Sequence, residues 1–552
     1  MTRGLRLCVG AGLVASFGIA LVAQEPGLPH LREQGSATQL VVDGRPFLIR
    51  GGELGNSSAS NLEYLAPYWD KFRALGLNTV LAPVSWDLLE PDEGRFDFTL
   101  VDGLVAGARA HDLRLVLLWF GSWKNSMSCY APGWVKKDQR RFPRASDASG
   151  TSVEILSPFS EAAADADARA FRALMKHLRA MDGDRHTVLM VQVENEIGMI
   201  PSARDHSEQA SRAFAAAVPG ELMTYLRERG ESLAPELRAT WLAAGAKATG
   251  TWTDVFGQGA AAEEIFMAWH FARFTERVAA AGKAEYPLPM YLNAALIRPG
   301  YQPGQYPSAG PLPHLLDVWR AGAPAADFLA PDIYFPTFMD WTRRYVRGGN
   351  PLFIPEALRG PDAAVNLLYA FATHDAIGFS PFAIESIPET AGRLLAASND
   401  VVAQLTPLII EHQGRRTMAG LLQEHPDNRQ PQQLSLNGYV LNASFEREAP
   451  PSLADGTQAG AAPSQAASPA GGLVIATAPD EFLFAGIGVT VTFATAEPGA
   501  QAGIVSVEEG RFVDGKWQNL RWLNGDETHQ GRHLRLVPGR FSIQRIKLYR
   551  YR

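Results

Sequence analysis

The sequence predicts a (β/α)8 TIM barrel of the α/β class, followed by an all-β sandwich domain. Two observations carry this prediction. From residue 46 to about residue 413, short apolar runs typical of buried strands alternate with amphipathic helical stretches, and the pair repeats eight times. After residue 413 the helical pattern stops, and strand-type alternation of polar and apolar residues takes over.

The length and composition of the chain limit the classes to which it can belong. Its 552 residues are too many for one hydrophobic core, so at least two domains are expected. Hydrophobic residues make up 46% of the chain, which is enough for large cores. A net charge of −7 leaves no excess of basic residues to neutralise phosphates, so nucleic acid is not expected as a partner.

The first 23 residues have the pattern of a secretory signal peptide. Two arginines precede an apolar stretch over residues 7–23, which contains the small residues Ala20 and Ala23 near its end. A membrane anchor is the alternative, but the stretch is short for a membrane span. We therefore expect a periplasmic or secreted protein with no stable membrane span after removal of the signal. Only Cys129 would then remain, so no internal disulfide is expected.

The barrel is predicted to occupy residues 24–413. Its expected strands are 46–51, 78–84, 114–120, 187–193, 289–293, 328–334, 352–355 and 376–382. The helical segments between them are 62–75, 101–111, 161–181, 312–321, 339–346, 363–373 and 391–412. The stretch 199–285 is too long for one strand-to-helix connection, and its helical segments at 219–228 and 260–281 predict an elaborated loop after the fourth strand. Such loops shape the active site, so this one is expected to wall the cleft.

The β-sandwich is predicted to occupy residues 414–552. Residues 450–472 are rich in Ala, Pro, Ser and Gly, which is typical of a surface loop. Strand-type runs follow at 473–477, 481–493, 503–508, 516–524 and 532–551, separated by turn-forming pairs such as Asp514-Gly515.

Two of the expected barrel strands, the fourth and the seventh, end on a glutamate. These are Glu196 and Glu356, and two carboxyl groups that flank one glycosidic bond are the minimum needed to hydrolyse it. Glu196 is expected to protonate the leaving oxygen and later to activate water, and Glu356 is expected to attack the anomeric carbon. The acid needs a raised pKa, which an apolar wall and the negative neighbour are expected to supply. The alternative is that either glutamate only pairs with an arginine at the top of the barrel.

Asn195-Glu196 after the fourth strand and Glu356 after the seventh resemble the clan of retaining (β/α)8 glycosidases. The wider pattern is similar to glycoside hydrolase family 35, the exo-acting β-galactosidases, in the bacterial secreted form with a β-rich C-terminal domain. The segments that carry this resemblance are 51–53 (GGE), 84–87 (VSWD), 119–125 (WFGSWKN), 192–198 (QVENEIG), 330–334 (APDIY) and 524–528 (NGDET). The resemblance implies galactose as the sugar, whereas the double displacement follows from the paired carboxylates.

Further residues at or after the expected strand ends are candidates for binding the substrate. They are Asn195, Glu53, Trp86, Trp123, Lys124, Asn125, Asn293, Tyr334 and Glu385. The rings among them can stack on a sugar face or cap the barrel core, and the amides and carboxylates can bind sugar hydroxyls or hold loops. Glu194 shares a strand face with Glu196 by the period of two, and we expect it to support its neighbours rather than to act as a third catalyst.

The chain departs from the animal and fungal members of family 35 in three places. It has Gly55-Asn56 where they carry His-Tyr, Pro83 where they carry a sugar-binding Tyr, and Ser122 where they carry a sugar-binding Glu. Lys124 and Asn125 are candidates to replace these contacts. The contacts with the sugar hydroxyls must therefore differ in detail, which leaves the identity of the sugar open.

The sequence thus predicts a retaining, exo-acting β-galactosidase that removes terminal β-galactose from oligosaccharide or polysaccharide fragments, such as those of plant cell walls. Two alternatives stay open, namely a glycosidase of the same clan for another β-linked sugar (glucose, mannose or arabinose) and a non-catalytic glycan-binding protein. No cofactor is expected, because both catalytic groups are side chains. No metal site is expected either, since the acidic and histidine residues around Asp526 match no ligand spacing.

Overall fold

The computed structural model of the chain describes residues 27–447 and 468–552. The expected signal peptide, residues 1–23, and most of the expected surface loop, residues 450–472, lie outside the described residues, so both stay predictions. Among the described residues, no helix has both the length and the apolar character needed to cross a membrane.

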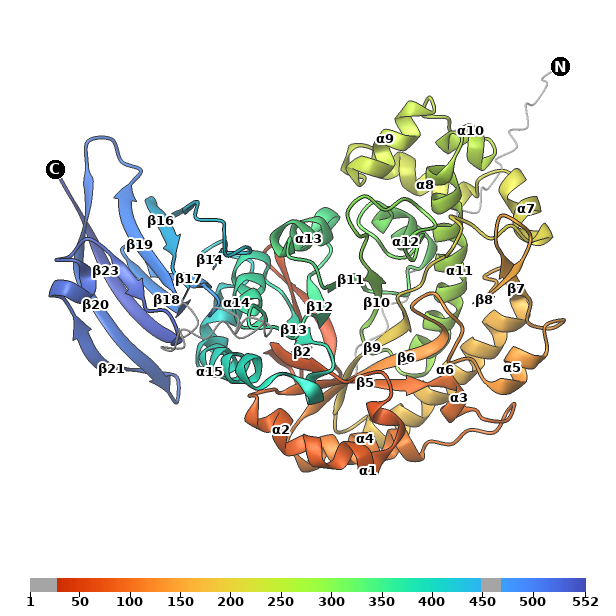
Figure 1. Cartoon of the computed structure of the whole chain (residues 1–552), viewed down its shortest axis with the longest axis horizontal. Coiled ribbons are helices and arrows are strands. Elements are labelled where there is room, and N and C mark those ends of the chain that lie inside the picture. Colours follow the sequence, from red (N-terminus) through yellow and green to blue (C-terminus); the bar gives the residue numbers. More distant parts are fainter. Residues whose placement is uncertain (1–26, 448–467) are drawn as a thin grey trace, which may run out of the picture.

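Eight parallel strands close into a barrel, which occupies the larger part of the molecule (Figure 1). In chain order they are β4 (Ile49–Glu53), β5 (Thr79–Ser85), β6 (Arg114–Lys124), β9 (Val188–Asn195), β10 (Met290–Ala295), β11 (Phe328–Ile333), β12 (Phe353–Ala357) and β13 (Gly378–Pro381). The pairing of β13 with β4 completes the ring. Each strand overlaps one of the eight predicted runs, so the predicted barrel is confirmed.

A small antiparallel sheet precedes the barrel, and the sequence analysis did not predict it. It contains β1 (His30–Gln34), β2 (Ala37–Val42) and β3 (Arg45–Phe47). Leu40 and Val42 of β2 join the apolar cluster inside the barrel, where they meet side chains such as Phe353 and Ile377. The run 46–51, predicted as one strand, spans the end of β3 and the start of β4. An apolar run carries no signal for the point at which the chain changes strand partners.

The helices after the strands form the outer layer of the barrel. They are α1 (Leu62–Leu65) with α2 (Trp69–Ala74), α4 (Thr99–Ala110), α6 (Glu161–Asp182), α11 (Ala260–Glu285), α12 (Leu316–Gly322), α13 (Phe338–Tyr345), α14 (Ala363–His374) and α15 (Glu389–His412). In α6, the Ser160 hydroxyl accepts the Ala163 N–H at the first turn, and residues such as Phe171 and Leu174 bury one face.

Additional elements gather on the side of the barrel that faces away from the C-terminal domain (Figure 1). After β9 these are α7 (Glu208–Ala215), α8 (Gly220–Arg229), α9 (Pro235–Ala243) and α10 (Trp252–Phe256), and after β5 and β6 they are α3 (Trp86–Leu89), α5 (Gly133–Lys137), β7 (Arg144–Ser146) and β8 (Ser152–Leu156). The helical segments predicted within the loop 199–285 correspond to α8 and α11. The others are too short to show a full amphipathic repeat.

Two antiparallel sheets form the predicted β-sandwich. The six-stranded sheet has the order β14 (Met418–Leu422), β17 (Gly471–Ala478), β18 (Glu481–Ile487), β23 (Ser542–Tyr551), β20 (Gln501–Val513) and β21 (Lys516–Leu523). The four-stranded sheet has the order β15 (Gln432–Leu436), β16 (Tyr439–Phe445), β19 (Val489–Thr495) and β22 (Leu534–Leu536). Side chains of both sheets, among them Tyr439 and Phe484, share one core. The predicted single run 481–493 divides at Gly488, whose φ of +64° turns the chain into β19.

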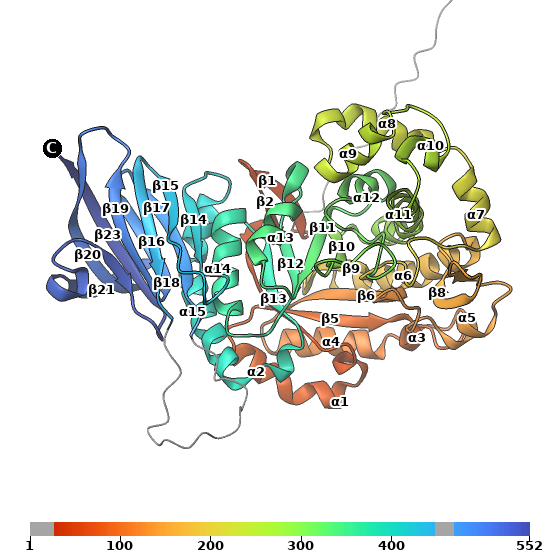
Figure 2. The ribbon, with the colours of Figure 1, turned by 45° about the horizontal axis from the view of Figure 1, so that its top comes forward.

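Helices α14 and α15 lie between the barrel and the sandwich in both views (Figures 1 and 2). Leu473 and Ile475 of β17 belong to the same apolar cluster as the outer layer of the barrel. The core is therefore continuous across the two parts, and the sandwich covers the flank of the barrel rather than its mouth.

Candidate active site

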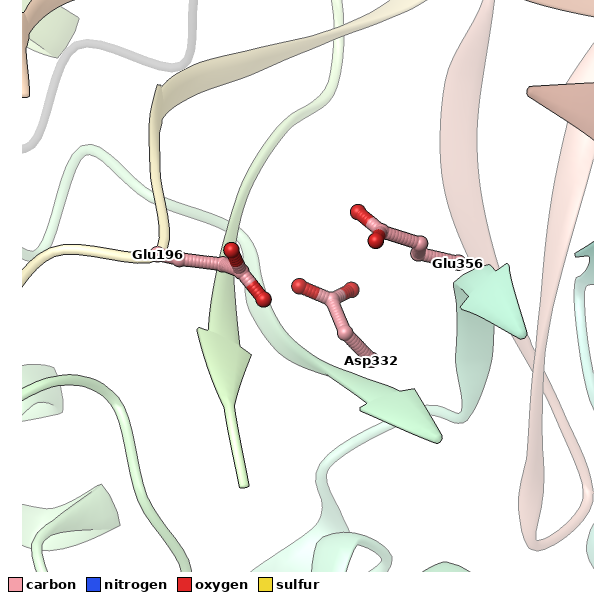
Figure 3. A group of neighbouring side chains, drawn as sticks. All are labelled: Glu196, Asp332 and Glu356. Carbon is pink, nitrogen blue, oxygen red and sulfur yellow. The ribbon is translucent and has the colours of Figure 1, made fainter. Parts of the chain in front are cut away.

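The two predicted catalytic glutamates lie at the carboxyl edge of the barrel. Glu196 directly follows β9, and Glu356 lies in β12. One carboxylate oxygen from each, together with one from Asp332 of β11, lie within 4.8 Å of one another. Figure 3 shows these three side chains pointing toward one another. Retaining glycosidases hold their two carboxyl groups about 5–5.5 Å apart, whereas inverting enzymes leave about 6.5–9.5 Å for a water molecule. The short separation favours the retaining arrangement.

Glu196 is held by polar groups from two neighbouring strands. Its Oε2 accepts a hydrogen bond from the amide of Asn125 and lies 3.7 Å from the ammonium nitrogen of Lys124. Its backbone N–H donates to Oδ1 of Asn293 at 3.0 Å. Because both side-chain contacts go to Oε2, Oε1 is left for the leaving-group oxygen of a substrate. Lys124 and Asn125 are thus brought to the site as predicted, although they contact the acid.

Glu356 receives a hydrogen bond from the hydroxyl of Tyr334. Burial and the nearby Glu356 carboxylate raise the pKa of Tyr334, so its hydroxyl stays protonated and remains a donor. A donor of this kind favours the charged form of the carboxylate that it contacts, which is the form that a nucleophile needs. Tyr334, predicted as a substrate-binding ring, therefore also serves the nucleophile.

The nucleophile of the pair has a shifted pKa. Burial and the charge of Glu196 raise the pKa of Glu356 to about 7. The raised pKa expected for the acid, Glu196, stays a prediction. Lys124 and the Tyr334 hydroxyl act in the opposite direction and lower the pKa of Glu356. The assignment of roles therefore rests on the contacts of the two side chains rather than on this shift.

Two more buried carboxyl groups, of Glu53 and Asp332, complete the acidic cluster. Burial and the charge of Glu356 raise the pKa of both well above the usual range. Oε1 of Glu53 and Oε2 of Glu356 are buried and have no hydrogen-bond partner among the described residues. Glu53 was predicted as a site residue, and the structure brings it into the cluster. Asp332 was missed, although it lies in the quoted segment 330–334 and its strand neighbour in β12 is Glu356.

Some buried polar atoms at this site have no hydrogen-bond partner among the described residues. They include both amide atoms of Asn195 and Oδ1 of Asp332. Buried polar groups are nearly always paired, so unpaired ones at a catalytic centre indicate positions where ligand groups complete the bonding. An amide offers one donor and one acceptor group, and a carboxylate offers acceptors, which suits the hydroxyl groups of a sugar.

The prediction that Trp86 and Trp123 stack on a sugar is wrong, because both rings are fully buried in the packed layers outside the barrel. The Trp86 ring N–H donates to Glu90 at 2.8 Å, and the ring packs edge-on against Trp134. The Trp123 ring N–H donates to the carbonyl of Leu156 at 3.1 Å. Their position in the sequence at strand ends does not specify which way the side chains point.

Glu385 and Asn293, predicted to bind the substrate, make contacts within the protein at the site, and their contact with a sugar stays a prediction. The Glu385 carboxylate accepts the N–H of Gly55 at 3.0 Å and the hydroxyl of Ser58 at 2.5 Å, so it holds the loop after β4. The Asn293 amide is used at both ends, since it accepts the Glu196 N–H and donates to Asp332 at 2.7 Å. Each residue therefore fixes a catalytic segment in place.

The cluster of Glu196, Asp332 and Glu356 also has the spacing of groups that can hold a metal ion. Hard divalent cations prefer six or more oxygen ligands, and the ammonium group of Lys124 already places a positive charge beside Glu196. The expectation that the reaction needs no metal stays a prediction.

Comparison with known proteins relates parts of the chain to β-galactosidases. Residues 63–256 match the family Glyco_hydro_42, described as beta-galactosidase, and residues 395–535 match DUF5597, a domain of unknown function. A β-galactosidase of Xanthomonas manihotis is 30% identical over 214 residues, which cover 36% of this chain and 32% of that protein. The chain thus matches about a third of that relative's length. These matches support the wider resemblance to β-galactosidases.

Similar folds occur among solved structures, at low sequence identity. The β-galactosidase of Bacillus circulans sp. alkalophilus has a TM-score of 0.45 and 14% identity, with 66% of this chain and 57% of that chain covered. For the β-galactosidase of Halorubrum lacusprofundi the TM-score is 0.45 and the identity 18%, with 65% and 58% covered. The catalytic domain of the Paenibacillus polymyxa β-amylase has a TM-score of 0.46 and 11% identity, with 64% of this chain and 98% of that chain covered. Because these TM-scores are low, the assignment of the barrel rests on the structure of this chain alone.

The finer expectation, membership of glycoside hydrolase family 35, is not supported. The matching model is that of family 42, and it covers the segment that contains Glu196. The family that matches is described as beta-galactosidase, as family 35 is, so the wider resemblance stands while the family itself changes. Glu356 lies outside the matched residues, and its assignment depends on its position opposite Glu196.

Proposed function

We propose that this protein is a retaining β-galactosidase related to family 42, which cleaves β-galactosides by double displacement. The main observation behind this proposal is the distance between Glu196 and Glu356 at the carboxyl edge of the barrel. One carboxylate oxygen of Glu196 lies within 4.8 Å of one of Glu356. The match of residues 63–256 to a β-galactosidase family supports the choice of sugar. The two acids alone are compatible with any β-linked pyranoside.

The first step forms a bond between Glu356 and the anomeric carbon. The carboxylate of Glu356 attacks that carbon, the glycosidic bond breaks, and Glu196 delivers its proton to the departing oxygen. The positive charge that develops on the sugar lies beside the carboxylate of Glu356, which is held in a fixed position in the buried site. Such a preorganised negative charge stabilises an oxocarbenium-like transition state.

The second step releases the sugar and restores both side chains. Glu196, now without its proton, takes a proton from water, and the water oxygen attacks the anomeric carbon. The bond to Glu356 breaks, and the product keeps the β configuration. Lys124 and Asn125 contact Glu196 throughout and balance the change in its charge.

The substrate is proposed to be a galactose-terminated oligosaccharide or polysaccharide fragment, of plant cell-wall origin among others, which is cleaved from its end. The near-complete burial of the acids supports end-on access, because each is only 4% exposed. Asn195 and Asp332 offer unpaired groups to the sugar hydroxyls. A periplasmic or secreted location is part of the proposal and rests on the N-terminal sequence pattern.

A panel of 4-nitrophenyl glycosides tests this proposal. The β-galactoside should be cleaved faster than the β-glucoside, β-mannoside and α-arabinoside, and proton NMR of the early product should show β-galactose. Glu356→Gly should abolish the cleavage. Faster cleavage of another sugar would transfer the proposal to that sugar, and an early α-product would contradict the retaining mechanism. An enzyme that cleaves none of them but binds galactosides would be a glycan-binding protein.

A further inference from the structure

A pair of buried carboxyl groups includes the residue two positions before the proposed acid. Glu194 of β9 and Asp167 of α6 are both completely buried, and their carboxyls are close neighbours. Oε1 of Glu194 and Oδ2 of Asp167 lie 2.7 Å and 2.9 Å from the point that a Cβ at Gly121 would occupy. Burial raises the pKa of both, and the charge of Asp167 raises that of Glu194 further. Two carboxyls in such contact cannot both be charged, so the pair holds a proton. Among the described residues, no hydrogen bond or ion pair brings a Lys, Arg or His side chain to either one. The catalytic steps above make no use of this pair.

The pair lies against a large bulge in β6. Trp119 pairs with Val193, and the next pair along the two strands is Lys124 with Asn195. Four residues of β6, 120–123, therefore stand opposite a single residue of β9. Backbone N–H groups in a bulge lose their partners on the neighbouring strand and need others when they are buried.

The two carboxyls supply those partners. The Ser122 N–H donates to Oδ2 of Asp167 at 2.9 Å, and the Trp123 N–H donates to Oε2 of Glu194 at 2.8 Å. Asp167 also accepts the Ser122 hydroxyl at 2.6 Å on Oδ2 and the Trp119 ring N–H at 2.8 Å on Oδ1. Both oxygens of Asp167 thus accept N–H or O–H groups. Oε1 of Glu194, in contrast, accepts no hydrogen bond among the described residues. The proton of the pair consequently belongs on Oε1 of Glu194, beside Asp167.

The backbone of the bulge packs closely against the pair, and a side chain would not fit at Gly121. A Cβ at Gly121 would lie 2.4 Å from the ring nitrogen of Trp119 and 2.7 Å from Oε1 of Glu194. Glu194 and Glu196 have φ values of +62° and +44°. Residues other than glycine rarely adopt such a backbone conformation, because it costs free energy. The bulge and the strained turn of β9 are therefore held together at this one point.

The bulge ends on the two residues that contact the acid. Lys124 and Asn125 follow it directly, and both contact Oε2 of Glu196. We propose that Asp167 and Glu194 are positioning residues, a pair sharing one proton that holds the β6 bulge so that Lys124 and Asn125 stay on Glu196. Where it concerns the acid step, this inference rests on the proposed function.

Two isosteric variants have opposite expected effects. Glu194→Gln keeps both contacts, because its amide oxygen accepts the Trp123 N–H and its NH2 group donates to Asp167. In Asp167→Asn, one of the two oxygens becomes an NH2 group, which is a donor. In one orientation of the amide this group faces the Ser122 donors, and in the other it faces the Trp119 ring N–H. Either orientation loses a hydrogen bond and should disrupt the bulge. The exposed Glu228→Ala serves as a control.

The activity test compares phenyl β-galactoside, whose leaving group needs a proton, with 2,4-dinitrophenyl β-galactoside, whose leaving group does not. For Asp167→Asn, kcat/KM should fall about 10–100-fold on the phenyl substrate and less than about threefold on the dinitrophenyl substrate. Glu194→Gln should stay within about threefold of the wild type on both. Equal losses of Asp167→Asn on the two substrates, or equal damage by the two variants, would overturn the proposal.

Hydrogen exchange of the peptide that covers residues 119–125 tests the pair without any activity. Exchange there should be at least about tenfold faster in Asp167→Asn than in the wild type, and unchanged in Glu194→Gln. Unchanged exchange in Asp167→Asn overturns the proposal even if the protein hydrolyses galactosides. Faster exchange supports the pair even if no glycoside is cleaved. If Asp167→Asn does not fold, Ser122→Ala should show a smaller change in the same direction, and no change there counts against the pair.

Discussion

The ammonium nitrogen of Lys124 lies 3.7 Å from Oε2 of Glu196. Burial by itself would lower the pKa of Lys124, but the carboxyl groups of Glu196, Glu356, Glu53 and Asp332 together raise it, so the side chain stays charged. Lys124 is the cation that faces the acidic cluster among the described residues. It offsets negative charge in this buried site.

Removal of this charge should impair catalysis strongly. Lys124→Met leaves the carboxyl cluster without its counter-charge, and kcat/KM on 4-nitrophenyl β-galactoside should fall about 100-fold or more. The pH dependence should also shift upward, because Lys124 lowers the pKa of Glu356. The exposed Lys137→Met is the matched control and should behave as the wild type. A loss of less than about threefold would show that Lys124 is not needed.

The pH profile should report the ionisation of Glu356. Attack requires the carboxylate, and its pKa is about 7, so kcat/KM should rise with pH up to that region. Tyr334→Phe removes a hydrogen bond that lowers this pKa, so the acidic limb should move up by about one unit. Tyr301→Phe, at an exposed tyrosine, should leave the limb in place. A limb that stays or moves down in Tyr334→Phe would contradict the assignment.

The same carboxyl should make the folded protein less stable as the pH rises. The pKa of Glu356 is raised to about 7 in the folded state from 4.5, so its stabilising contribution is complete below about pH 4.5 and is lost as the pH rises through 7. Glu356→Gln removes this dependence. The free energy of unfolding of Glu356→Gln minus that of the wild type should be about 1–3 kcal/mol larger at pH 8 than at pH 5. Urea unfolding of both proteins at pH 5 and pH 8 measures this difference. The same difference at both pH values would refute the raised pKa of Glu356.

Azide rescue should separate the two catalytic roles. Glu196→Ala keeps the nucleophile, so activated aryl galactosides still form the intermediate, and azide should release a β-galactosyl azide. In Glu356→Gly, azide can only take the place of the missing nucleophile, so a product of retained configuration is not expected. Identification of the azide anomer by NMR decides the matter. An α-azide from Glu196→Ala would mean that the roles are reversed.

The barrel and the catalytic pair could be predicted because their signals are local. Each barrel strand is a short apolar run, and each run is bounded by residues that end a strand. A glutamate that follows such a run lies at the carboxyl edge whatever the rest of the chain does. Glu196 and Glu356 needed nothing more than this to be found.

The directions of the other polar and aromatic side chains depend on contacts between distant segments. The bulge in β6 and the positive φ at Glu194 break the simple alternation along the strands, so Trp123 points into the packed helices while Lys124 faces the acid. Asp167 comes from a helix, where no strand pattern connects it to the site. Period-two and strand-end arguments therefore missed it.

The sequence by itself determined the barrel, the sandwich and the two glutamates at strand ends, because backbone periodicity and burial follow from neighbouring residues. Only the tertiary structure decided that Asp332 joins the site, that Trp86 and Trp123 do not, and that Asp167 contacts the β6 bulge. Packing and strand register between remote segments set those directions, and no local pattern contains them.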